Sequence, residues 1–334
     1  MSRFPSPAAI TDVLLECTIV GSFTKIGYGV RSRTADWTDP PGVLSGQTAI
    51  VTGSTSGIGR ATADGLLALG ADVIVTSRNA DRAESAAKEL NASIRSGSQK
   101  PGVATGLALD TSSFASIIAF AEAAERVSDS FDVVAHNAGA LTDTYRTDDR
   151  GLELTLSSHL VGPYLLTNLL KPNLTPGARV IFMSSGGMYT QGLDVQRIEM
   201  SEKNFKGAVA YARAKRGQVE MVTHLGPTWA PDILLHAMHP GWVDTPGVDA
   251  GLPGFGKVMG PLLRDADQGA DTMVWLAAGG ATSEKPGQFW LDRAPRLTTY
   301  LPGTGTTRSE RDRLIAWLDE QISTGFESDP ISET

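Results

Sequence analysis

The clearest candidates for chemistry are Tyr211 and Lys215, which stand four positions apart in the stretch YARAK. Side chains at i and i+4 are neighbours on a helix, so a phenol and an amine at this spacing lie close together. A free tyrosine has a pKa of about 10, too high for efficient proton exchange at neutral pH, and a nearby ammonium lowers it. The pair is a candidate acid–base site, although any two side chains on one helical face share this spacing.

A glycine-rich stretch, VTGSTSGIGR, places Gly53, Gly57 and Gly59 between an apolar run and a helical pattern. In dinucleotide sites such glycines allow a tight turn, close approach of the backbone to the pyrophosphate and close packing of the helix. An ordinary glycine-rich turn is the alternative. Because the stretch falls at the first strand–turn–helix junction, we expect a dinucleotide site that also includes Ser56 and Ile58.

The end of the second apolar run bears on the choice of dinucleotide. NAD sites usually offer an Asp or Glu there to the ribose hydroxyls, whereas NADP sites accommodate the extra phosphate with an Arg. This run ends TSRN, without a carboxylate, and Arg78 presents a fixed fork of donors to a phosphate. We therefore expect NADP, a solvated surface arginine being the alternative.

Polar and small residues follow the third and fourth apolar runs. Asp110 closes the third run, where it could accept from the adenine amine or cap the next helix. Ala138 and Gly139 after the fourth run are small enough to let the chain pass close to a cofactor. Asn137 before them could tie neighbouring strands together through its side chain.

Short β-rich runs that alternate with helical patterns carry all these residues. Such alternation predicts right-handed βαβ units, and the continuous apolarity of the runs is typical of strands covered on both faces. We expect a doubly wound Rossmann-type α/β fold, with a seven-stranded parallel sheet, helices on both faces and an N-terminal helical extension. The predicted strands are 48–53, 72–77, 102–110, 132–139, 179–185, 233–241 and 288–292.

The length of 334 residues fits one large domain with terminal extensions. We expect an N-terminal extension over 1–45, a dinucleotide-binding catalytic domain over 46–300, and a C-terminal helix and tail over 301–334.

These motifs, in this order, resemble the short-chain dehydrogenase/reductase family over about residues 45–300. The stretches SSGGM, QGADTMVWLA and FWLDRAP are similar to its subgroup of dehydrogenase/reductase family member 12. The resemblance rests on TGxxxGxG at 52–59, NAG at 137–139, the serine pair at 184 and 185, YxxxK at 211–215 and HPGWVDTPG from 239.

The resemblance implies a role for each residue that is expected to take part in catalysis. Tyr211 exchanges a proton with the substrate, Lys215 reaches the nicotinamide ribose, and Ser185, second in its pair, holds the substrate oxygen. The oxidised nicotinamide would help Lys215 to lower the tyrosine pKa. The turn HPGWVDT is expected to receive the carboxamide, through Pro240, Gly241, Val243 and Thr245.

The chain departs from the family pattern at His159, which stands where the family has an asparagine of the proton relay. Histidine both donates and accepts, so it could replace that asparagine, or it could be a buried residue satisfied by backbone. The stretch from 186 to 207 is longer than the compact pattern and is expected to form an extra loop at the substrate mouth. A Gly- and Pro-rich segment, 245–262, is expected to be a lid with an apolar underside of Leu252, Phe255, Val258 and Met259.

Composition excludes several classes of partner. A net charge of −8 argues against nucleic acid, and the single cysteine, Cys17, allows no internal disulfide and favours the cytoplasm. His236 and His239, three apart on a strand, would point to opposite faces, so we expect no metal site. His136 and His224 are expected to be core or surface residues.

The N-terminal segment predicts a short amphipathic helix, with Ile10, Val13, Leu14, Cys17 and Val20 at helical spacing. Packing of this apolar side against the protein body is the first expectation. Weak contact with a membrane surface is the alternative, although the polar side lacks the lysines and arginines that such anchors prefer.

The leading hypothesis is an NADP-dependent oxidoreductase that interconverts an alcohol and a carbonyl on an apolar small molecule. A cofactor-binding regulatory or scaffold protein with little turnover is the alternative. In the family, long helices after the fourth and fifth strands commonly pair subunits, so a homo-oligomer remains open.

Overall fold

The computed structural model describes residues 7–35, 37, 43–93, 102–244, 259–281 and 286–327. Most of the expected lid, including Leu252, Phe255 and Val258, lies outside the described residues, as does Thr245 of the expected cofactor turn.

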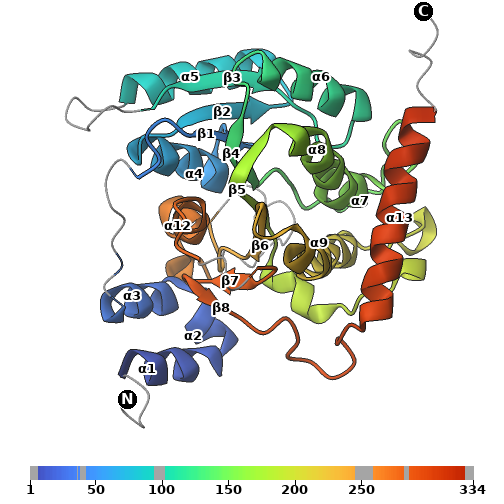
Figure 1. Cartoon of the computed structure of the whole chain (residues 1–334). Helices are drawn as coiled ribbons and strands as arrows, with labels where there is room; N and C mark the ends of the chain where they lie inside the picture. The colour runs from blue at the N-terminus through green and yellow to red at the C-terminus, as the bar shows by residue number, and fades with distance from the viewer. Residues whose placement is uncertain are drawn as a thin grey trace, which may run out of the picture.

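The centre of the molecule is one sheet in the order β3-β2-β1-β4-β5-β6-β7-β8 (Figure 1). Neighbouring strands from β3 to β7 run parallel, so the predicted doubly wound fold is confirmed. The carboxyl ends of these strands lie at one edge, where such sheets bind ligands. The strands are β1 Thr48–Val51, β2 Asp72–Ser77, β3 Ala104–Ala108, β4 Phe131–His136, β5 Leu174–Met183, β6 Ile233–Met238, β7 Phe289–Leu291 and β8 Ala294–Pro295.

The sheet has one strand more than the seven expected. After β7 the chain reverses at Asp292 and Arg293, which have φ of 53° and 56°, and β8 pairs antiparallel with β7. Two consecutive residues with positive φ make the tight hairpin turn that matches the twist of the strands. The run QFWLD contains neither glycine nor asparagine, the usual signals of such a turn.

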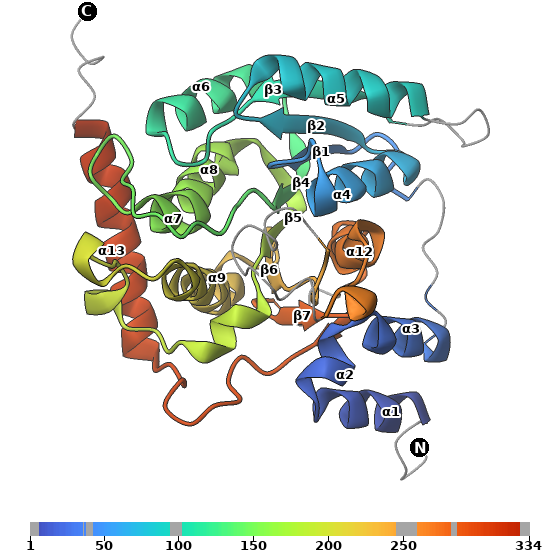
Figure 2. The same cartoon turned by 180° about the vertical axis from the view of Figure 1, so that it is seen from behind.

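Helices cover both faces of the sheet (Figures 1 and 2). One apolar core includes α4, α5 and α12, and the other includes α6, α8 and α9. The helices are α1 Pro7–Glu16, α2 Ile19–Phe23, α3 Lys25–Thr34, α4 Gly57–Ala68, α5 Ala80–Ser93, α6 Phe114–Glu125, α7 Leu154–Leu156, α8 Gly162–Leu170, α9 Gly207–Trp229, α12 Ala266–Ala277 and α13 Arg308–Glu327.

Short 3₁₀ and π-helical turns connect some of the longer elements. A π-helical turn, η1, links α7 to α8. The expected extra loop after the fifth strand contains three 3₁₀ turns, η3 to η5. The turns are η1 Ser157–Val161, η2 Lys171–Asn173, η3 Gly186–Thr190, η4 Val195–Arg197, η5 Glu202–Asn204 and η6 Gly260–Leu262.

The C-terminal helix α13 crosses and packs against α9, one of the helices expected to pair subunits (Figure 2). Arg311 of α13 donates to the buried Glu220 of α9 at 2.6 Å. Tyr164 of α8 donates to Asp319 of α13 at 2.6 Å. Part of the face that could pair two subunits is therefore covered by the chain itself.

The N-terminal helices α1 to α3 lie together beside β7 and β8 (Figure 1). The expected helix exists, but the expected packing of its apolar side is wrong. Val13 is 63% exposed and Leu14 66%, with Ile10 and Val20 also exposed. The polar side packs inward instead, because Asp12 and Glu16 form ion pairs with buried arginines. Among the described residues, no helix is both long and apolar enough to cross a membrane.

Candidate active site

The glycine-rich turn between β1 and α4 leaves space that larger residues would fill. Gly53 and Gly57 have φ of 65° and 55°, a region that favours glycine. A Cβ on Gly53 would lie 2.9 Å from the Cα of Ala138, and one on Gly59 would collide with the Gly53 carbonyl oxygen. The α4 N-cap, Ser56, makes no side-chain capping bond, so the first amides of α4 lack that partner. These features fit a pyrophosphate at the helix N-terminus.

Asn137 ties the ends of β1 and β4 together, as its sequence position led us to expect. Its side-chain amide donates to the oxygens of Thr52 and Gly53 at 3.0 and 3.1 Å. The hydroxyl of Thr52 in turn accepts from the backbone amides of Asn137 and Ala138, both at 2.9 Å. The glycine-rich turn and the NAG segment are therefore held side by side.

Arg78 is exposed one residue beyond β2, and Asp110 follows β3 on the neighbouring strand. Arg78 has no hydrogen bond or ion pair with another described residue, so its guanidinium is available to a ligand. The alternative role of Asp110 as a helix cap is wrong, because Ser113 caps α6. Asp110 instead accepts from the amide and hydroxyl of Ser112, at 2.9 and 2.7 Å.

The two serines after β5 differ in their surroundings. Ser184 is buried, and its hydroxyl donates to the main-chain oxygen of Lys215 at 2.9 Å. The hydroxyl of Ser185 accepts from the amide of Gly187 at 3.2 Å, and its side chain lies beside Tyr211. Only the second serine therefore lies beside the phenol.

Tyr211 and Lys215 lie one turn apart on α9, as their spacing predicts. Burial raises the pKa of Tyr211, and the neighbouring Ser185 side chain opposes this rise. Lys215 was expected to lower the pKa of Tyr211, but the charge of Lys215 is not among the causes that act on this pKa in the folded chain. Burial also lowers the pKa of Lys215 to about 7, so at neutral pH the amine carries only a fraction of a charge. Its Nζ lies 5.5 Å from the centroid of the Tyr211 ring.

His159 is buried beside Tyr211, with 5.2 Å between the ring centroids. Its Nε2 lies 3.0 Å from the oxygen and 3.2 Å from the amide of Ala140. Burial and the positive charge of Lys215 hold the pKa of His159 well below its usual range, so the ring is neutral. Its buried Nδ1 has no hydrogen-bond partner among the described residues.

The turn after β6 faces the glycine-rich turn across α12. A Cβ on Gly269 of α12 would collide with the side chain of Val243, and would lie 3.3 Å from that of Ile58. Val243 and Ile58 are therefore neighbours, although 185 positions separate them in the sequence. The structure thus brings the two expected ends of a dinucleotide site to one edge of the sheet.

Sequence reasoning did not single out Phe23 and Arg264, which both contact this turn. Arg264 donates to the oxygens of Phe23 and Pro240, at 3.1 and 3.2 Å. No motif marks either residue, and 241 positions separate the two, so only the folded chain shows the contact.

The other histidines have structural partners. His236 accepts from Trp290 at 3.2 Å, His239 accepts from the amide of Gly241 at 3.2 Å, and His136 pairs with Thr167 at 2.8 Å. His224 is partly exposed beside Asp312. Among the described residues, no group of three or more His, Cys, Asp or Glu could hold a metal ion.

A cavity of about 620 Å³ lies elsewhere, beside α6 and α13, and is lined by Phe114, Arg150, Glu199 and Gln321 among others. It contains none of the expected catalytic residues.

Comparison with known proteins agrees with this geometry. The short chain dehydrogenase family model matches residues 47–251. Dehydrogenase/reductase SDR family member 12 of Bos taurus is 37% identical over 307 residues, which cover 89% of this chain and 93% of that protein. Retinol dehydrogenase 14 of Homo sapiens is 31% identical over 274 residues, which cover 75% of this chain and 80% of that protein.

A solved structure supports the same fold. The angucycline C-6 ketoreductase LanV with bound NADP has a TM-score of 0.60 and 20% identity, and the match covers 76% of this chain and 96% of that chain.

The sheet order and the glycine-rich turn define an α/β protein of the dinucleotide-binding class. Within that class, the chain belongs to the short chain dehydrogenase family. It is an oxidoreductase that acts on CH–OH or C=O groups of small molecules.

Proposed function

We propose that this protein is an NADP(H)-dependent oxidoreductase that interconverts an alcohol and a carbonyl on an apolar small molecule. The observation that carries the proposal is the position of the Ser185 side chain beside Tyr211, with Lys215 one turn from the tyrosine on the same helix. A phenol held beside a second hydroxyl can direct both groups at one substrate oxygen.

In reduction, Tyr211 donates its hydroxyl proton to the carbonyl oxygen while Ser185 donates a hydrogen bond to the same oxygen. In oxidation, Tyr211 must first be ionised, and the phenolate then accepts the proton from the alcohol. The dinucleotide, when bound, supplies or receives the hydride. Burial raises the pKa of Tyr211, which keeps the phenol protonated and favours its role as an acid in carbonyl reduction.

Lys215 and His159 support this proton transfer. The Nζ of Lys215 would bind the ribose hydroxyls of the nicotinamide. His159, neutral and with Nδ1 unpartnered among the described residues, could hold a water molecule that passes the proton on. His159 would then take over the function in the proton relay that an asparagine has in the family.

NADP is the proposed cofactor because Arg78 is exposed at the end of β2, where the ribose 2′-phosphate of NADP binds in such folds. The pyrophosphate would bind Gly53, Ser56, Gly57, Ile58 and Gly59. Asp110 would contact the adenine, and Asn137, Ala138 and Gly139 would pass beneath the ribose. Pro240, Gly241, Val243 and Thr245 would receive the carboxamide. The NADP bound to LanV supports this choice.

An apolar substrate is proposed from the names of two similar proteins, a retinol dehydrogenase and an angucycline C-6 ketoreductase. The exposed apolar residues of α1, including Val13 and Leu14, add a second proposal of weak contact with a membrane surface. Such contact, from the cytoplasmic side, would bring the protein close to membrane-dissolved substrates.

A panel of aldehydes, ketones and lipid alcohols, with NADPH consumption or NADP reduction as readout, tests the catalytic proposal. Tyr211→Phe is the matched control, because it removes only the hydroxyl. We expect at least one compound to be turned over by the wild type and not by the variant. Equal consumption by both proteins on every compound would favour the cofactor-binding scaffold instead.

A further inference from the structure

The N-terminal helices reach the expected cofactor turn through the short segment Ser22–Thr24. The oxygen of Phe23 accepts a hydrogen bond from the amide of Trp242 at 2.7 Å. The ring of Phe23 lies edge-on to His239, with 4.5 Å between centroids, and to Trp242, with 5.9 Å. This segment therefore packs directly against the turn that follows β6.

One buried guanidinium holds this segment and the turn together. Arg264 is 1% exposed and donates to the oxygens of Ser22 and Phe23, at 3.0 and 3.1 Å. It also donates to the oxygen of Pro240 at 3.2 Å. Its own backbone pairs with the same turn, because its amide donates to the oxygen of Trp242 at 2.8 Å.

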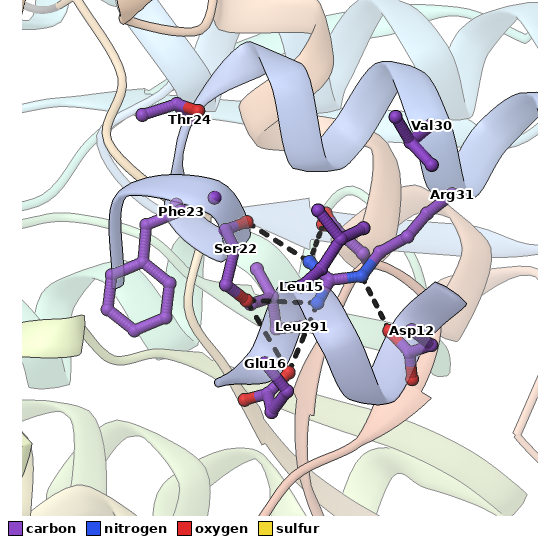
Figure 3. A network of polar contacts seen from close by, with 12 residues as sticks. Asp12, Leu15, Glu16, Ser22, Phe23, Thr24, Val30, Arg31 and Leu291 are labelled. Carbon is purple, nitrogen blue, oxygen red and sulfur yellow. Dashed lines mark hydrogen bonds and ion pairs between the residues drawn. The ribbon is translucent and has the colours of Figure 1, made fainter. Parts of the chain in front are cut away.

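Asp292 fixes Arg264 in this position. Its carboxylate accepts from Arg264 at 2.6 and 2.9 Å and from Arg31 at 2.7 Å. Arg31 also donates to the oxygen of Ser22 at 3.0 Å, and it binds Asp12 and Glu16 (Figure 3). Removal of one partner from a buried ionic network leaves an uncompensated charge, so the parts of this network hold each other in place.

The turn has little room to move within this cluster. Gly241 has φ of 79°, and a Cβ there would lie 2.6 Å from the oxygen of Phe23 and would collide with Arg264. On its other side, Phe23 reaches the turn that begins after Ser185, because a Cβ on Gly186 would lie 2.8 Å from its ring. Phe23 thus lies between the expected cofactor turn and the serine turn.

We infer that Phe23 and Arg264 are positioning residues of the active site, through which the N-terminal segment Ser22–Thr24 holds the turn Pro240–Val243 in its cofactor-binding form. This inference rests on the proposed function, since it assigns the turn to the cofactor. It adds that residues outside the family-matched part of the chain, 47–251, set the affinity for the nicotinamide end.

The test measures NADPH affinity by fluorescence titration, and melting temperature, for four full-length variants. Phe23→Ala removes the ring but keeps every charge, and Phe23→Leu restores most of the lost volume. Arg264→Met removes the guanidinium. Arg150→Met is the matched control, because Arg150 ties Asp148 to the main-chain oxygen of Gln321 in α13 and not to the turn.

We expect Phe23→Ala and Arg264→Met to raise the Kd for NADPH by about tenfold, equivalent to about 1.4 kcal/mol. Phe23→Leu should recover most of that affinity. Arg150→Met should lower the melting temperature but leave the Kd within about twofold of the wild type. A change in Kd that does not simply follow the change in melting temperature distinguishes a positioning role from a general effect on stability.

Wild-type affinity in Phe23→Ala would overturn the inference, as would an equal loss of affinity in Arg150→Met at an equal loss of melting temperature. Should Arg264→Met fail to fold, Phe23→Ala decides alone. A wild-type protein that binds neither NADPH nor NADH would instead refute the proposed function, which makes the two failures distinguishable.

Discussion

The amine of Lys215 donates a hydrogen bond to the main-chain oxygen of Met183 at 2.6 Å. This bond joins α9 to the end of β5 and holds Lys215 on the side of the sheet edge where Ser185 and Tyr211 lie. Because the amine is buried, its pKa falls from 10.5 to about 7. The same burial that positions the amine therefore makes stability depend on pH.

Stability should rise between pH 7 and about pH 10. In this window the folded chain keeps Lys215 largely neutral, whereas the unfolded chain protonates it, so unfolding takes up a proton and becomes less favourable as pH rises. The full effect is roughly 3–5 kcal/mol, since one pKa unit corresponds to about 1.4 kcal/mol. Buried tyrosines oppose it only near and above their ordinary pKa of 10.0.

Urea denaturation of the wild type and of Lys215→Met at pH 7 and pH 9.5 measures this effect. The variant should gain less stability than the wild type over the same interval. Parallel pH curves for the two proteins would show that the buried amine does not titrate as proposed.

Replacement of the two neighbouring serines should have different effects. Ser185→Ala should reduce kcat by about 10²-fold or more, with little change in melting temperature, because it removes a hydrogen bond to the reacting oxygen. Ser184→Ala should cost about 1 kcal/mol of stability, because its hydroxyl binds the Lys215 oxygen. Steady-state kinetics and denaturation of both variants check the assignment. A larger loss of kcat in Ser184→Ala would reverse it.

Arg78→Asp should reverse the cofactor preference. A carboxylate at this position repels the 2′-phosphate of NADPH and can accept from the ribose hydroxyls of NADH. We expect the ratio of the two dissociation constants to change by about 10²-fold or more. The control is Arg126→Asp, the same charge change at an exposed position after α6. An unchanged ratio in Arg78→Asp would remove this arginine from the site.

His159→Asn tests the proton relay. If the histidine holds a relay water, asparagine should preserve turnover, whereas His159→Leu, of similar bulk but apolar, should lower kcat by about 10-fold or more. Both variants lose the contact between the Nε2 of His159 and the oxygen of Ala140. Their melting temperatures therefore measure how much His159 contributes to stability. Equal turnover in the two variants would indicate that His159 only packs in the core and takes no part in the proton relay.

Membrane contact through α1 should depend on its exposed apolar residues. We expect the wild type to float with vesicles of phosphatidylcholine containing about 20% phosphatidylserine, and a Val13→Asp, Leu14→Asp variant to remain in the bottom fraction. Val127→Asp, at a 43% exposed valine of the main domain, is the control. Flotation of the double variant, or sedimentation of the wild type, would contradict membrane contact. Self-association of the wild type without vesicles would indicate a second copy as partner.

The sequence by itself determined the fold class and the order of the candidate residues along it. Alternating apolar and helical runs identify the seven strands of the parallel part of the sheet directly, and the glycines at 53, 57 and 59 predict a turn that closely meets a helix start. These signals are local: they depend on periodicity and on backbone freedom within a few positions, which a single stretch of chain specifies.

Only the tertiary structure decided what each side chain meets. Sequence periodicity identified the apolar side of α1 but placed it inward, because it could not show that Arg31 and Arg296 would bind Asp12 and Glu16 from within. It predicted a lowered tyrosine pKa, because it could not show that Lys215 is buried and that Tyr211 is desolvated. Desolvation and buried ion pairs depend on residues that are distant in the chain and become neighbours only on folding. The side of α1 that packs inward and the direction of the Tyr211 pKa shift therefore follow from the packed structure and not from local spacing.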